Sequence, residues 1–197
     1  MPEGVSTSDV SVTTGADGGD VVTLASSVSG LTITASGSKS TTIAGSSIAD
    51  STITAAPAVG QTAVVSVETS KFVGSDIVNT GAGAISVDVS ASKVKGSSIT
   101  SGASADSVSF SAKAKLKNVT LELGKGSDTV TFGKKTKIKK GVEIELAGKK
   151  NTVIIETNKG VGKLTVSGIS SKDKFTVGGE DFTAQEAKNG DAGFQVD

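Results

Sequence analysis

The sequence predicts an all-β protein, a single-domain parallel β-helix (β-solenoid) of about eight coils of about 22 residues. The first observation is a repeat, in which an isolated apolar residue returns every 21 to 24 positions, at Ile48, Phe72, Val94, Leu116, Ile138, Val161 and Phe182. The second is that short β-branched segments of alternating polarity flank this residue, as at 108–110 and 119–123, which is the pattern of half-buried strands. The third is that no window carries an apolar period of 3.6 long enough to predict a helix. A repeat of this length indicates a solenoid, because each unit needs its neighbours to bury its apolar face.

Each coil is predicted to hold three short strands. The first strands centre on residues 22–24, 42–43, 65–67, 85–87, 108–110, 130–132, 153–155 and 175–177. The isolated apolar residue forms the second strand, and the third strands follow at 31–33, 51–53, 77, 99, 121, 144 and 166. Stacking at roughly 4.8 Å would give eight coils a length of roughly 38 Å, with the right-handed coiling that is the default for parallel crossovers. We therefore expect a β-helix over 19–182, an extended N-terminal arm or cap over 1–18, and a C-terminal cap or docking tail over 183–197.

The composition argues against an enzyme. The chain has no Cys, His, Arg, Trp or Tyr, which removes disulfides, thiolate metal sites, the commonest general base and the bidentate anion clamp. Glu143 and Glu145 are predicted to share one outward face about 7 Å apart. Glycoside hydrolysis also needs a cleft, however, and the predicted turns are too short to build one. We expect no catalysis and no cofactor.

Targeting signals are not evident in the sequence. The N-terminus lacks a basic start and an apolar run of about 7 to 15 residues, so we expect no conventional secretory signal. No stretch approaches the length of a membrane span. The protein is thus expected to act where it is made, or to leave by a route that needs no N-terminal signal, such as release with a virion at lysis.

The formal charge is divided along the predicted rod. Residues 1–112 carry four Lys against nine acidic residues, a net of −5, and residues 113–197 carry sixteen Lys against eleven, a net of +5. Opposite net charges on the two halves favour assembly into a homo-oligomer or with other structural subunits. The alternative is that the division reflects only evolutionary drift in the identity of solvated surface residues. An uncapped solenoid also exposes sheet edges that template association. The candidate contacts at the two ends are Val5, Val10, Val12, Phe194 and Val196.

Lysines flank the isolated apolar position in several coils. Because alternate residues of a strand face opposite sides, these lysines are predicted to point outward and to stack into two columns: Lys93, Lys95, Lys115, Lys117, Lys137 and Lys139, with Lys71 before Phe72. Such a face could bind an anionic surface such as a polysaccharide. The alternative is protection against unwanted sheet association, which exposed lysine provides. We expect no nucleic acid as partner, because neither Arg nor a stacking aromatic accompanies the lysines.

The third strands carry hydroxyl side chains outward. Thr32 and Thr34 are followed one coil later by Thr52 and Thr54, an array similar to the surface of ice-binding β-solenoids. Glutamates interrupt the array in later coils, so ordinary β-branched strand surface is the stronger interpretation.

Acidic residues recur at one predicted corner, two positions before the first inward residue of a coil, at Asp20, Asp106, Asp128 and Asp173, with Asn151 in the same series. The sequence favours turn chemistry, in which Asp or Asn bonds to nearby backbone. Calcium is the alternative, since carboxylates one coil apart could bridge a hard cation.

At the level of architecture, the chain resembles the β-helical structural proteins of phage particles and bacterial surface appendages. The resemblance covers about residues 20–182 and rests on a V-x-F, apolar, V-x-apolar pattern, as at 108–110, Leu116 and 119–121. It implies a non-enzymatic, self-associating structural subunit located in a virion, as decoration, fibre or appendage. The alternative is an extracellular or cell-surface filament or adhesin that binds an anionic surface. Minor alternatives are a bactofilin-like cytoskeletal polymer, whose coils are shorter and richer in Gly, and an ice-binding solenoid.

Overall fold

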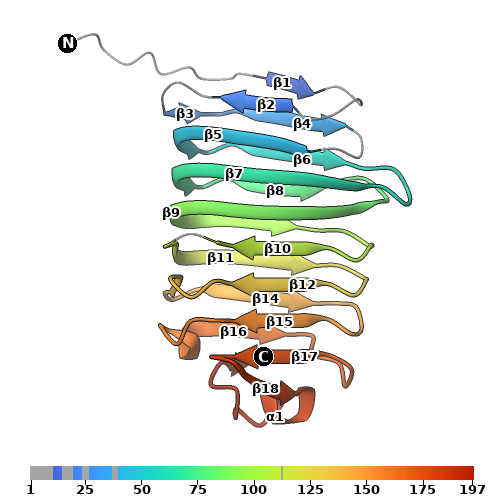
Figure 1. Cartoon of the computed structure of the whole chain (residues 1–197), viewed down its shortest axis with the longest axis vertical. Coiled ribbons are helices and arrows are strands. Elements are labelled where there is room, and N and C mark those ends of the chain that lie inside the picture. The colour runs from blue at the N-terminus through green and yellow to red at the C-terminus, as the bar shows by residue number, and fades with distance from the viewer. Residues whose placement is uncertain (1–10, 15–19, 24–26, 37–39, 112) are drawn as a thin grey trace, which may run out of the picture.

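The computed structural model describes residues 11–14, 20–23, 27–36, 40–111 and 113–197. The chain winds into a β-solenoid of about seven turns with a spacing of about 22 residues, which confirms the predicted fold class. β1 (Ser11–Thr14) lies at one end of the rod and the C-terminal cap lies at the other (Figure 1). Successive coils pair in parallel along the rod, so each strand bonds to its equivalents one coil away.

The first-strand face is built from the strands that open each coil. In chain order these are β2 (Asp20–Thr23), the beginnings of β5 (Ser40–Ala49), β7 (Thr62–Val73) and β9 (Ala84–Thr100), then β10 (Ser107–Phe110), β12 (Thr129–Phe132), β15 (Thr152–Ile155) and β17 (Lys174–Val177). Val108 pairs with Val87 on one side and with Val130 on the other. Because side chains alternate along a strand, this register places one buried residue over another in coil after coil.

The third-strand face repeats the same arrangement. It is formed by β1, β4 (Thr32–Ser36), β6 (Thr52–Ala56), β8 (Asp76–Asn79), the end of β9, the second half of β11 (Lys115–Leu123), β14 (Val142–Leu146), β16 (Leu164–Ser167) and β19 (Gln195–Val196). Leu121 pairs with Ile99 and with Ile144, and all three are buried. The predicted third-strand positions at Ile99, Leu121 and Ile144 are therefore confirmed.

The isolated apolar residues lie between the two faces. They belong to β3 (Val28–Ser29), to the long strands β5, β7, β9 and β11, to β13 (Lys137–Ile138) and to the 3-10 helix η1 (Val161–Lys163). Leu116 pairs with Val94 on one side and Ile138 on the other. Leu116 is 0% and Ile138 2% exposed. The prediction that these two residues are buried one above the other is therefore confirmed.

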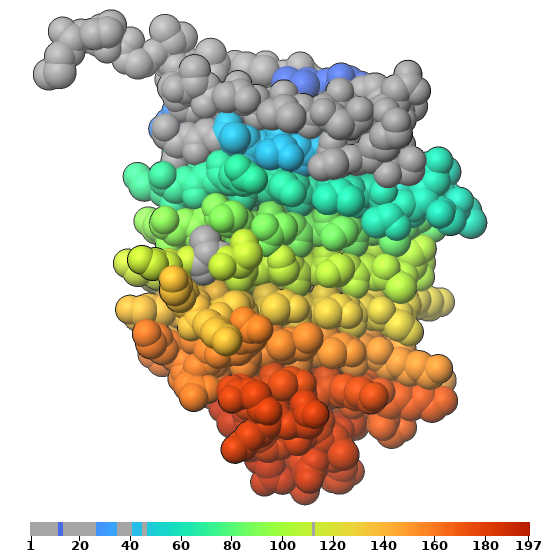
Figure 2. Space-filling model, viewed as in Figure 1, coloured from blue at the N-terminus to red at the C-terminus, as the bar shows by residue number. Residues whose placement is uncertain are grey.

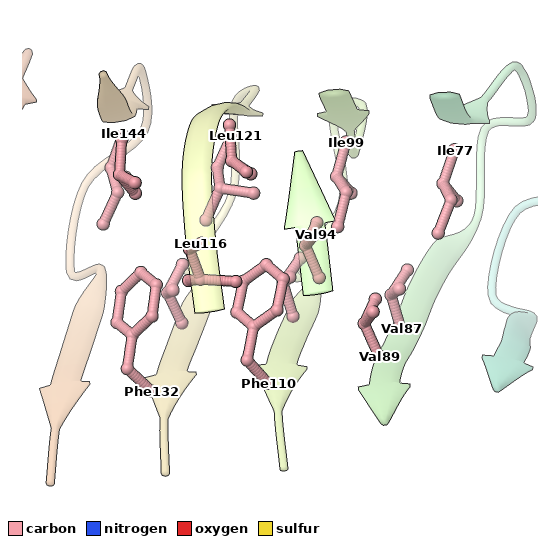
Figure 3. Packing of buried hydrophobic residues seen from close by; sticks show 14 of the residues in the cluster. Ile77, Val87, Val89, Val94, Ile99, Phe110, Leu116, Leu121, Phe132 and Ile144 are labelled. Atoms are coloured by element: carbon pink, nitrogen blue, oxygen red, sulfur yellow. The ribbon is translucent and has the colours of Figure 1, made fainter. Parts of the chain in front are cut away.

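A single hydrophobic core runs inside the coils. Phe110 and Phe132, one coil apart, stack with ring centroids 5.5 Å apart and planes 8° from parallel. Leu116 and Leu121 approach these rings from the other strands, and Ile99 from the neighbouring coil lies beside them (Figure 3). Each coil thus supplies one layer of the core, and no coil can bury its apolar residues without the next.

The C-terminal cap ends the parallel stack. β18 (Glu180–Thr183) returns antiparallel on β17 through Gly178 and Gly179, whose φ values of 63° and 94° favour glycine. The half-buried Phe182 lies in this return strand. The prediction that Phe182 is the buried residue of a further coil is therefore wrong, because the chain reverses direction between β17 and β18.

A short helix follows the return strand. α1 (Ala184–Lys188) starts with a capping box, in which Thr183 Oγ1 accepts from the Glu186 N–H and the Glu186 carboxylate accepts from the Thr183 N–H. The N–H and the hydroxyl of Thr183 both donate to the Glu186 carboxylate and lower its pKa. The helix is too short to show an apolar period, but the T-x-x-E motif at 183–186 is its signal in the sequence.

The candidate end contacts take different positions in the structure. Val5 and Val10 lie outside the described residues. Val12, in β1, packs half-buried against the core. Phe194 is buried with its ring 5.3 Å from Phe175, so it belongs to the cap of its own chain. Val196 is 38% exposed. The capped end is narrower than the coils next to it (Figure 2).

Candidate binding faces and buried polar columns

The predicted lysine columns exist as a feature that we call the lysine ladder: Lys71, Lys93, Lys95, Lys115, Lys117, Lys137 and Lys139. Lys93 pairs with Lys71 on one side and Lys115 on the other, and Lys115 pairs in turn with Lys137. In the second column Lys117 pairs with Lys95. Parallel pairing thus puts like charges in rows about 4.8 Å apart along the rod.

All seven side chains of the lysine ladder are exposed. In the part of the chain that the structure describes, none of their ammonium groups has an ion-pair or hydrogen-bond partner. The backbone beneath them is fixed, because β11 is bonded to β9 and to β13 while Val94, Leu116 and Ile138 anchor the inward side. The arrangement is a rigid, uncompensated positive strip that follows the rod axis.

The outward residues of the third-strand face change character along the rod. Thr13, Thr34 and Thr54 form one column, beside Thr32 and Thr52 in the next. Asp76 and Val78 follow in the next coil and interrupt the threonine array.

Glutamates occupy the same face further along. Glu122 pairs with Glu145, and Glu143 lies two residues before Glu145 in β14. Glu143, Glu145 and Asp197 line a shallow hollow of about 410 Å³. The predicted sharing of one face by Glu143 and Glu145 is borne out by their exposure and register.

The aspartate column, made of Asp106, Asp128, Asn151 and Asp173, lies buried at the corner before the first strands. Each side chain accepts a hydrogen bond from the backbone of the preceding coil. The Ile85 N–H donates to Asp106 Oδ1 (2.6 Å) and the Asp106 N–H to Asp128 Oδ1 (2.9 Å). The Asp128 N–H donates to Asn151 Oδ1 (2.9 Å) and the Asn151 N–H to Asp173 Oδ1 (2.8 Å). These four bonds therefore join five successive coils, from the coil of Ile85 to that of Asp173.

Burial is energetically unfavourable for the charges of this column. Asp106 Oδ2 and Asp128 Oδ2 are buried with no hydrogen-bond partner among the described residues. Burial, aided by the charges of Asp106 and Asp173, raises the pKa of Asp128 from 3.8 to about 6, against the bond from the Asp106 N–H. Burial also raises the pKa of Asp106, opposed by the bond from the Ile85 N–H. The turn chemistry predicted for these residues is present, extended from one coil to the next.

Asp20 does not belong to this column. Asp20 pairs with Thr41, and Thr41 pairs with Val65. Asp20 therefore occupies the strand position of the inward valines, which is two residues after the position of the aspartate column. Its side chain lies outside the described atoms. The sequence places Asp20 at the aspartate corner wrongly, because the first coil is offset by two residues. Among the described residues no group of three or more acidic side chains surrounds a possible metal position.

A second buried column, which the sequence reasoning missed, consists of Ser51, Ser75 and Ser97. The N–H of Leu31 donates to Ser51 Oγ (3.1 Å), that of Ser51 to Ser75 Oγ (3.2 Å) and that of Ser75 to Ser97 Oγ (3.3 Å). Each hydroxyl also donates to the carbonyl two residues earlier in its own chain segment. The signal was a Ser two residues before Ile53, Ile77 and Ile99.

Another hollow lies where the last coil meets the cap. It has a volume of about 880 Å³, and its lining includes Lys150, Lys172, Lys174, Phe182 and Thr183. It is a step in the surface between the full coils and the narrower cap (Figure 2).

No known protein family, no curated protein and no solved structure matches this chain. No helix in the described part of the chain is long and apolar enough to cross a membrane.

Proposed function

We propose that this protein is a non-enzymatic structural subunit, a rigid rod that builds a larger assembly. The observation that carries the proposal is the unbroken parallel stack from β4 to β17 around one core. Bending such a rod requires breaking backbone hydrogen bonds in every strand at one level, so it keeps a fixed length and fixed side faces. Those are the properties of a spacer or building block.

The two ends suggest how such a subunit associates. The C-terminal end is closed by β18, α1 and the buried Phe194. Association through the C-terminal core is thus disfavoured, and contacts through the N-terminal segment or the side faces are favoured. The division of charge, −5 over 1–112 and +5 over 113–197, supports ordered contacts between copies or with other subunits.

The proposed setting is a virion, with an extracellular or cell-surface appendage as the alternative. The rod, its division of charge and its exposed hydroxyl and lysine faces support both settings equally. Antibodies raised against the purified protein would separate them, because they would label released particles in the first case and cell-bound appendages in the second.

The test of assembly is light scattering of the full chain at tens of micromolar, with electron microscopy of the same sample. We expect oligomers or filaments of constant width, which dissociate when residues 1–10 are deleted or salt is raised. The variant Val59→Ser, which changes an exposed side chain (81%) at a corner of the rod, is the control and should assemble normally. A full chain that stays monomeric, alone and with candidate partner subunits, would contradict the proposal.

A further inference from the structure

We propose that the lysine ladder is a binding site for a linear acidic polysaccharide, whose chain lies along the rod axis. This inference goes beyond the proposed structural role, since it applies to a single rod as well as to an assembly. The ladder provides the chemistry that would recognise this partner: rows of positive charge with exposed hydroxyl groups beside them.

The geometry sets the direction of the bound chain. Both lysine columns follow the rod axis, since Lys115 pairs with Lys93 and Lys137 in one column and Lys117 pairs with Lys95 in the other. The two columns are separated by one buried residue, Leu116 in the middle coil, which places them about 7 Å apart. A polymer chain can therefore lie between the columns and meet an ammonium group from either side in the coils of Val94, Leu116 and Ile138.

The electrostatics favour a polyvalent anion. Unit charges about 4 Å apart repel by about 1 kcal/mol in water, and no acidic side chain among the described residues pairs with the ladder. One anion would gain little, because exposed ion pairs are individually weak. A chain with repeated carboxylates gains from many such pairs at once, because each later contact forms at high effective concentration.

Two other polyanionic partners fit less well. Nucleic acids are held by arginine and by stacking aromatics, but the chain has no Arg, and Phe72, Phe110 and Phe132 are buried beneath the strands. Anionic membranes are held by lysine together with inserted apolar side chains. The exposed large apolar residues of the described chain are Val59 and Val196, and neither flanks a lysine of the ladder.

Hydroxyl groups beside the ladder suit a sugar partner. Ser70 and Ser92 are exposed and directly precede Lys71 and Lys93. Ser47 is half-exposed and pairs with Lys71, so it continues the lysine column toward the N-terminus. Such groups can exchange hydrogen bonds with the hydroxyls of a polysaccharide that lies between the columns.

The experiment compares two variants of equal charge for binding to polygalacturonate, a linear polymer with one carboxylate per sugar. The ladder variant is K115Q/K117Q/K137Q/K139Q. The matched control is K125Q/K149Q/K150Q/K172Q, which removes the same charge from exposed lysines near the aspartate corner. Thermal unfolding of both variants should match the parent chain, because all eight side chains are exposed.

We expect the ladder variant to bind at least about tenfold more weakly than the parent, while the control changes by less than about threefold. Binding by the parent should weaken steeply when the salt concentration is raised roughly tenfold, from about 50 to about 500 mM, because salt screens exposed charges. It should also be lost when the carboxylates of the polymer are esterified.

Three results would overturn the proposal. Equal weakening of the ladder variant and the control would mean that net charge alone attracts the polymer. Undiminished binding by the ladder variant would leave protection against sheet association as the role of the lysines. Tighter binding of the parent to single-stranded polynucleotide than to polygalacturonate, at equal charge concentration, would exclude a polysaccharide as the preferred partner.

Discussion

Buried polar residues at two different corners of the coil bond the backbone of the preceding coil in two ways. Ser75 Oγ accepts a bond from the Ser51 N–H of the preceding coil and donates its own hydrogen to the Val73 carbonyl, so its hydroxyl has both kinds of partner. Asp128 accepts the Asp106 N–H with one oxygen and keeps its other oxygen buried and unpaired. A repeated buried serine is therefore satisfied at any ordinary pH, whereas a repeated buried carboxylate makes stability depend on its protonation.

The variant Asp128→Asn should be more stable than the parent at pH 7, by about 1 kcal/mol. The folded chain binds the Asp128 proton more tightly than the unfolded chain does, since burial raises its pKa from 3.8 to about 6. The contribution of this proton is thus fully present below about pH 4 and falls as pH rises through about 6. An asparagine keeps the acceptor and removes the charge, as Asn151 does one coil later.

Denaturant unfolding at pH 4 and pH 7 measures this effect. The gain from Asp128→Asn should disappear at pH 4, and the exposed control Glu145→Gln should change stability little at either pH. A variant that is less stable than the parent at pH 7, or a gain that is the same at both values, would show that the buried charge is not the source of strain in the column.

The variant Leu116→Asp should unfold at least the neighbouring coils. Leu116 is 0% exposed, so the change puts an unpaired carboxylate in a narrow core, which costs several kcal/mol. Circular dichroism and thermal melting would show the loss. Thr120→Asp places the same group outward on β11 and is the control, with a melting curve close to that of the parent. Unchanged melting of Leu116→Asp would contradict the core described above.

Elements at the two ends of the rod differ from the coils between them. The repeat predicts strands wherever its period holds, because alternation and a buried register are both visible in the sequence. The repeat fails at β18, where Gly178 and Gly179 turn the chain back. Phe182 keeps the spacing of the repeat there, but its strand runs antiparallel to β17.

The buried serine column was missed because a lone Ser in a Ser-rich chain carries no distinguishing pattern until the register brings Ser51, Ser75 and Ser97 together.

The variant Phe194→Ala should destabilise the last coil by about 3 kcal/mol, since it removes a buried ring that packs on Phe175. Hydrogen exchange of the β17 amides should accelerate, with smaller effects in coils farther away. Val196→Ala, at the exposed neighbouring position, should change stability by less than about 0.5 kcal/mol. Loss of oligomers with no change in exchange would instead identify Phe194 as a contact between copies.

At the scale of the whole molecule, one register decides both the core and the outer faces. The same pairing that stacks Leu116 on Ile138 also stacks Lys115 on Lys137. The sequence alone predicts the lysine columns, since they follow from the period and from alternation along a strand. It does not predict that their charges stay unpaired, because that depends on which side chains the neighbouring turns bring close.

The measurement that tests the stack most directly is a set of spin-label distances, which is simple to obtain because the chain contains no cysteine. Ser66 is separated from Ile154 by four coil steps and from Thr176 by five, through successive pairs in one column. At about 4.8 Å per coil we predict roughly 19 Å and 24 Å between the two backbone positions. The second distance should thus exceed the first by about one coil spacing, although 22 residues intervene. Distances that are broad, or that differ by much more than one coil spacing, would contradict the in-register β-solenoid.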